Sequence, residues 1–166
     1  MPTKCYCHFL DVFDEVATLE TLPIWSWPWW ITFQLKIDSF ISNEWCRLLQ
    51  FTATGSDRLP TFSLHSKSKQ MEVTMINYET DGTRRYERLL SSVNSGRWYF
   101  VKTTIEKRAV GPYHIVLYID GIEIAQKILW TDSNNGVDVI VKLFGPGTAC
   151  LGSKIKNLNY GCQREP

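Results

Sequence analysis

The chain has 166 residues, and its 18 basic and 17 acidic side chains leave a formal net charge of +1. This balance argues against a nucleic-acid-binding protein, which needs clustered positive charge. Hydrophobic residues make up 44% of the chain, which excludes wholesale disorder, and the length fits one domain with a substantial core. Two counts are unusual. There are seven tryptophans and five cysteines, and an odd number of cysteines excludes complete pairing within the chain.

The N-terminal residues show no basic region followed by a long apolar stretch, so we recognise no signal peptide there. The longest apolar cluster, residues 24–33, is interrupted by polar residues and proline, and it is far shorter than the roughly 20 residues of a membrane span. We therefore expect a soluble protein, which is either cytosolic or a processed part of a secreted one.

The dominant pattern along the chain is the alternation of apolar and polar side chains. Residues 11–22 have apolar side chains at roughly helical spacing, but a bent strand fits them almost as well. From residue 30 onward the period is two, which is typical of half-buried strands. The predicted strands are 30–37, 49–53, 61–65, 71–75, 98–107, 113–119, 122–126, 137–143 and 154–160. Asp120-Gly121 predicts a two-residue hairpin, because both positions need positive φ.

About ten strands separated by turn signals predict a β-sandwich or a β-barrel. Three motifs in this pattern, two of them made of paired segments, match motifs of known protein modules. Residues 95–102, followed by 113–121, are similar to the signature "G-x-W-x-x-V, then L-x-V-D-G". Residues 137–145 and then 152–158 are similar to closing strands that read "V-K-V-Y", a small-residue turn and "G-x-I-x-N-L". Residues 58–65 are similar to an "R-I-P-x-x-x-x-H" segment.

Together these motifs resemble concanavalin A-like jelly-roll modules, in particular the laminin G-like modules of extracellular proteins of marine invertebrates. The resemblance covers about residues 22–160. It implies an all-β fold, an antiparallel two-sheet β-sandwich with the chain termini close together. We expect one domain at residues 22–162, with residues 1–21 as a tail or first strand packed on it and 163–166 as a short tail.

The resemblance implies a non-enzymatic, extracellular, lectin-like binding module that recognises a glycan or a glycosylated protein. The alternative is a structural or self-assembling matrix protein, a homo-oligomer joined through interchain contacts or a disulfide. A glycoside hydrolase of the same fold is the second alternative. It requires paired carboxylates on one strand face, and the sequence has no such run, so we predict no catalytic residue. We expect neither a nucleic-acid partner nor a membrane span.

Four of the seven tryptophans fall between residues 25 and 30. Aromatic rings stack on sugar faces, because the ring carries a negative face and the sugar C–H bonds are weakly positive. Trp25, Trp27 and Trp29 are therefore candidates for glycan or partner contact, although the same cluster could instead cover one end of the core. Arg84 and Arg85 are further candidates, with a solvated strand face as the alternative.

Calcium is common in laminin G-like and pentraxin-like modules, and its ligands are loop oxygens of Asp, Asn and backbone carbonyls. Asp132, Asn134 and Asp138 form the best candidate loop here. Turn-forming Asp and Asn also occur for backbone reasons alone, so the sequence requires no cofactor.

The resemblance further implies a disulfide between Cys150 and Cys162, because laminin G-like modules often close their C-terminal hairpin with a bridge that ends in a Gly-Cys pair. Cys5, Cys7 and Cys46 are candidates for a second or an interchain bridge, and Cys46 could equally be buried as a small apolar residue. The extracellular, oxidising setting rests mostly on this resemblance.

Overall fold

The computed structural model describes most of the sandwich core and leaves several connections out. The described residues are 6–8, 17–25, 28–40, 45–52, 60–78, 81–109, 112–129, 136–143 and 152–162. Their regular structure consists of antiparallel β-strands. No helix among them has the length and hydropathy that crossing a bilayer requires.

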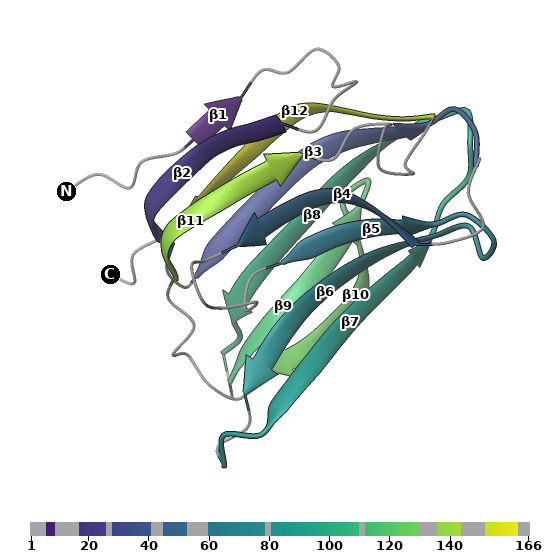
Figure 1. Cartoon of the computed structure of the whole chain (residues 1–166). Helices are drawn as coiled ribbons and strands as arrows, with labels where there is room; N and C mark the ends of the chain where they lie inside the picture. Colours follow the sequence, from purple (N-terminus) through teal and green to yellow (C-terminus); the bar gives the residue numbers. More distant parts are fainter. Residues whose placement is uncertain are drawn as a thin grey trace.

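Twelve strands of the described residues form two six-stranded sheets, which lie face to face as two layers (Figure 1). In sheet A the order is β1 (Tyr6–His8), β12 (Ser153–Cys162), β3 (Trp29–Ile37), β8 (Trp98–Lys107), β9 (Tyr113–Ile119) and β10 (Ile122–Leu129). In sheet B it is β2 (Ala17–Trp25), β11 (Gly136–Leu143), β4 (Trp45–Thr52), β5 (Thr61–His65), β6 (Gln70–Tyr78) and β7 (Arg84–Ser92). The predicted antiparallel two-sheet β-sandwich is confirmed.

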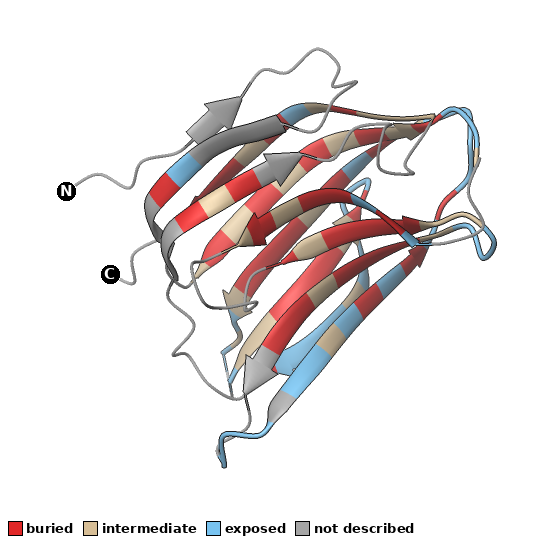
Figure 2. Cartoon of the chain, viewed as in Figure 1, coloured by how far each residue is buried: buried red, intermediate tan, exposed pale blue. Residues whose placement is uncertain are grey.

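The core lies between the two sheets and is built by strict alternation. Along β3, every second residue is buried, which places Ile31, Phe33 and Leu35 inside. Figure 2 shows the same alternation of buried and less buried residues along most strands of both layers. Phe33 of sheet A meets Phe62 of sheet B edge to face, with ring centroids 5.0 Å apart. This is a favourable arrangement for aromatic rings, and it joins the two layers.

The pairing of the first strand with the last agrees with the expectation that the chain termini lie close together. Strand β1 pairs with β12, the last strand, and Cys7 lies opposite Asn159. The hairpin at Asp120-Gly121 is also confirmed, with φ of 52° and 82°. The backbone N–H of Phe100 donates to Asp120 Oδ1 at 2.8 Å, so the Asp120 side chain ties this turn to β8.

Two elements differ from the sequence-based predictions. Strand β7 was not predicted, because its sequence, Arg-Arg-Tyr-Glu-Arg-Leu-Leu-Ser-Ser, alternates weakly. For residues 11–22 the sequence left a helix and a bent strand open. Residues 17–22 belong to strand β2, which agrees with the strand, and residues 11–16 lie outside the described residues. Strand β2 pairs with β11, and the predicted domain boundary between residues 21 and 22 falls inside it.

The inter-sheet contact of Phe33 can be tested by mutation. Replacing the fully buried Phe33 by alanine removes the ring that packs on Phe62, and we expect the free energy of unfolding to fall by about 3–5 kcal/mol. Denaturant unfolding followed by tryptophan fluorescence measures it. Phe33→Leu keeps much of the side-chain volume and should cost less. A loss under about 1 kcal/mol for Phe33→Ala, the size of an ordinary point mutation, would contradict the central place of this contact.

Candidate functional site

The predicted tryptophan surface is wrong for Trp29. Its side chain is only 1% exposed and belongs to the core cluster. The reason is its phase, because Trp29 stands two residues before Ile31 on β3 and therefore points into the same core. Trp25 lies on β2 with its side chain outside the described residues, and Trp27 lies outside them altogether. Their predicted role stays a prediction.

The predicted arginine contacts lie at the start of the edge strand β7. Arg85 is exposed, but it is in phase with the buried Leu89, so it does not share the outer face of sheet B. Arg84 has the opposite phase, and its side chain is outside the described residues. Another arginine of the same strand, Arg88, has the phase of Arg84 and lies on the outer face.

The calcium prediction also stays untested. Asp132 and Asn134 lie outside the described residues, and Asp138 lies on strand β11 with its side chain not described. In the part of the chain that the structure describes, no three His, Cys, Asp or Glu side chains gather where they could hold a metal ion.

The predicted disulfide between Cys150 and Cys162 is wrong. Cys162 carries a thiol and packs, half-buried, against the core cluster at the end of β12. Cys46, at the start of β4, is 4% exposed and disulfide-bonded. Cys5 and Cys150 lie outside the described residues, and only the backbone of Cys7 is described.

A polar face that the sequence did not reveal covers the outer side of sheet B. The strand register places Trp45 opposite His65. In the next row, Ser63 lies between Arg47 and Glu72. The third row, from β4 to β7, is Gln50, Thr61, Thr74 and Arg88. Four neighbouring strands therefore contribute polar or aromatic side chains to one surface.

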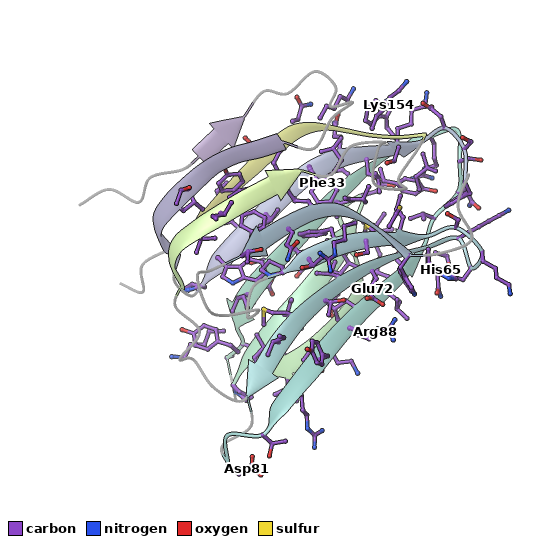
Figure 3. The ribbon with its side chains drawn as sticks, viewed as in Figure 1. Phe33, His65, Glu72, Asp81, Arg88 and Lys154 are labelled. Carbon is purple, nitrogen blue, oxygen red and sulfur yellow. The ribbon has the colours of Figure 1, made fainter. Side chains whose placement is uncertain are left out.

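Glu72 lies at the centre of this surface and is only 8% exposed. The hydroxyl of Thr74 donates to its Oε1 at 2.6 Å. Arg88 donates to Oε2 through Nε at 2.7 Å and also through Nη2, which makes an ion pair. Figure 3 shows Glu72 and Arg88 next to each other on this sheet, with His65 nearby. A nearly buried carboxylate with both oxygens bonded is a fixed part of the surface.

Trp45 stands beside this ion pair and remains 40% exposed. Its ring centroid lies 4.6 Å from that of His65, and the guanidinium carbon of Arg88 lies 5.7 Å from the Trp45 ring centroid. His65 is itself held, because the backbone N–H of Ser68 donates to its Nδ1 at 3.1 Å. The indole is therefore supported by two side chains while part of it faces solvent.

A hollow of about 350 Å³ opens on the same face. Its polar lining comes from Arg47, Gln50, Thr61, Ser63, Thr74 and Tyr86. Tyr86 is 59% exposed. Hydroxyl and amide groups both donate and accept hydrogen bonds, so this lining suits a ligand rich in hydroxyl groups.

Sequence reasoning missed this surface for two reasons. The sequence predicts this strand only from residue 49, whereas β4 begins at Trp45, so Trp45 lies outside the predicted strand. Glu72 and Arg88 are 16 residues apart, and nothing brings them together until β7 is recognised as a strand paired with β6.

The fold is that of the concanavalin A-like jelly-roll proteins. No family model and no curated protein matches the sequence. Similar solved structures include an endo-β-1,4-glucuronan lyase from the fungus Trichoderma reesei, with 11% identity and a TM-score of 0.57 over 97% of this chain and 74% of that one. A native heptameric SAP-like pentraxin from Limulus polyphemus has 10% identity and a TM-score of 0.56 over 95% of this chain and 75% of that one.

The receptor binding domain of botulinum neurotoxin D is a third similar structure, with 11% identity and a TM-score of 0.62. The match covers 99% of this chain but only 45% of the toxin chain. At such identities the likeness concerns the fold alone.

The Glu72 network predicts a measurable loss of stability. Glu72→Gln keeps the shape but removes the charge that Arg88 and Thr74 bond, so we expect the free energy of unfolding to fall by about 1–3 kcal/mol. Denaturant unfolding near neutral pH measures the change. The matched control is Glu87→Gln on β7, which we expect to stay within about 0.5 kcal/mol of the parent protein. Equal effects of the two substitutions would show that the network contributes nothing specific.

Proposed function

We propose that this protein is a non-enzymatic binding module that holds a glycan, or the glycan of a glycosylated partner, on the outer face of sheet B. The observation that carries the proposal is Trp45, an indole that is 40% exposed, is supported by His65 and Arg88, and lies on the same face of sheet B as the hollow. Keeping a large aromatic ring partly in solvent leaves its apolar area unburied, and stacking on a sugar face recovers that burial.

The polar groups on the same face of sheet B as the Trp45 ring support the same ligand class. Gln50, Thr61 and Thr74 stand in one row and offer hydrogen bonds of both directions to sugar hydroxyls. Arg47 lines the same hollow, and its guanidinium is a planar fork of donors suited to hydroxyl or carboxylate oxygens. A protein of the same fold whose name gives a binding role, the receptor binding domain of botulinum neurotoxin D, is consistent with this function.

We also propose that the protein does not cleave its ligand. This needs its own argument, because one similar structure is a lyase. On the described outer face of sheet B, Glu72 is the central carboxylate, and both of its oxygens accept hydrogen bonds. Hydrolysis of a glycosidic bond requires two carboxylates placed on either side of it. This argues against hydrolysis of a glycosidic bond at this site. The absence of lyase activity is a separate part of the proposal, tested below with glucuronan.

Trp45→Ala should weaken glycan binding by about tenfold or more, the effect of removing one stacking ring worth roughly 1.4 kcal/mol. A glycan array identifies the ligand, and titration calorimetry with that ligand measures the loss. Ile122→Ala is the matched control, because Ile122 is 66% exposed but lies on β10 of the other sheet. We expect it to leave the affinity unchanged.

Three results would contradict the proposal. They are no binding on the array with or without calcium, equal loss in the two variants, and release of shorter products when the protein is incubated with glucuronan or a β-glucan panel. The calcium arm also tests the predicted loop at residues 132–138, because chelation should abolish binding only if calcium is a part of the site.

We further propose that the protein works in an oxidising, extracellular setting. The disulfide at Cys46 supports this, because such bonds persist mainly in oxidising compartments. The alternative of a self-assembling matrix protein rests on the near-neutral charge and the odd cysteine count.

Thiol titration of the natively purified protein in denaturant tests the setting. We expect fewer than five reactive thiols before reduction and five afterwards, since Cys46 is bonded. Five thiols without reduction would contradict an oxidised protein. A non-reducing gel of the same sample distinguishes the two proposed functions. A binding module should migrate as a single chain, and a matrix protein as covalent multimers.

A further inference from the structure

The outer face of sheet A carries a cluster of lysines and aromatic rings, which we call the lysine face. Its members are Lys36, Lys102, Lys154, Lys156, Trp98, Phe100 and Tyr118. Strand register places them in three successive rows. The first row runs from Lys154 through Lys36 to Trp98. The second ends at Phe100, and the third contains Lys102 and Tyr118.

Two of the four ammonium groups lie over aromatic rings. Lys156 Nζ is 4.0 Å from the centroid of the Trp98 ring, and Lys102 Nζ is 5.1 Å from that of Tyr118. Among the described residues, neither ammonium has a carboxylate oxygen within 4.0 Å, the limit of an ion pair. A cation over a ring keeps its full charge, so both remain available to an anion.

The other two lysines share one carboxylate at the end of the face. Asp38 lies 2.9 Å from Lys154 Nζ and 3.3 Å from Lys36 Nζ. The hydrogen bond from Lys154, followed by that from Lys36, holds the pKa of Asp38 below its usual value, so Asp38 is ionised at neutral pH. One carboxylate against four ammonium groups leaves this part of the face positive, although the whole chain carries only +1.

Acidic side chains border the lysine face. Asp120 accepts the backbone N–H of Phe100 and pairs with Arg97, and Glu123 lies opposite Tyr118. Glu106 accepts the Tyr118 hydroxyl at 2.8 Å, and Glu123 pairs with Arg108 at 3.0 Å. Burial and the bond to Glu106 raise the pKa of Tyr118 to about 12, so its ring stays neutral beside Lys102. Arg97, Arg108 and the Tyr118 hydroxyl therefore occupy these carboxylates, and the excess positive charge of the lysines lies over β12, β3 and β8.

We infer that the lysine face binds an acidic polysaccharide, whose carboxylate or sulfate groups pair with the lysines while one of its sugar rings lies on the exposed ring of Phe100. This goes beyond the proposed function, because the surface lies on the opposite sheet from Trp45 and uses none of the same residues. The ammonium groups repeat along three rows of a flat sheet, and this arrangement is complementary to a linear chain with repeated negative charges.

The aromatic residues favour a polysaccharide over other polyanions. Phe100 is 43% exposed in the row between the lysines and offers a ring for a sugar face. A membrane surface is favoured by apolar side chains that can insert between lipids, whereas here the ring of Trp98 is covered by Lys156. A polyanion without sugar rings would leave the Phe100 contact unused.

The test uses the full chain and heparin as the probe, measured by titration calorimetry at low and at physiological salt. Lys102→Gln with Lys156→Gln should weaken binding by about tenfold or more, and binding of the parent protein should fall as salt rises. The matched control is Lys67→Gln with Lys127→Gln, which removes the same charge from exposed positions elsewhere and should bind as the parent does. Lys102→Arg with Lys156→Arg keeps the charges and should retain binding.

Thermal unfolding of each variant checks that the fold is intact. No heparin binding, or equal weakening by the two Gln pairs, would overturn the inference. So would binding to vesicles that contain phosphatidylserine in place of heparin, which would identify a membrane surface instead. Trp45→Ala should leave heparin binding unchanged, so failure of this inference and failure of the proposed function give different results.

Discussion

The shared core between the two sheets is the constraint on which the rest of the molecule depends. Each strand can bury only every second side chain, and edge-to-face contacts such as Phe33–Phe62 and Phe51–Tyr160 fix which set faces inward. Once that choice is made, the remaining side chains must face solvent. The chemistry of the two outer surfaces is thus a direct consequence of how the core is packed.

Irregularities in the strands adjust these outer surfaces. In β4 the register shifts between Arg47 and Leu49, so both Leu48 and Leu49 are buried and Gln50 faces outward beside Arg47. In β12 a similar shift falls between Lys156 and Asn159, with Asn157 at a φ of 53°. A bulge changes the phase of a strand and re-aims the side chains after it. One bulge therefore shapes the hollow of sheet B, and the other lies at the border of the lysine face.

Much of the fold could be predicted from the sequence, because β3, β8 and β9 alternate cleanly and Asp120-Gly121 has a strong hairpin signal. The site could not, since it depends on pairing between strands. Trp29 was misjudged although its phase with Ile31 was visible in the sequence, whereas Trp45 lies before a bulge that hides the alternation of its strand. The contact between Glu72 and Arg88 requires the register of β6 and β7, and β7 alternates too weakly to be recognised alone.

The most direct test of the proposed site is to map ligand contacts over the whole chain without mutation. Backbone amide shifts recorded by NMR during titration with a glycan identified on the array would do this. The proposed site predicts that the largest changes fall on the four strands β4 to β7, around Trp45, Glu72 and Arg88. Changes concentrated instead in residues 25–30, the predicted tryptophan cluster, would contradict it.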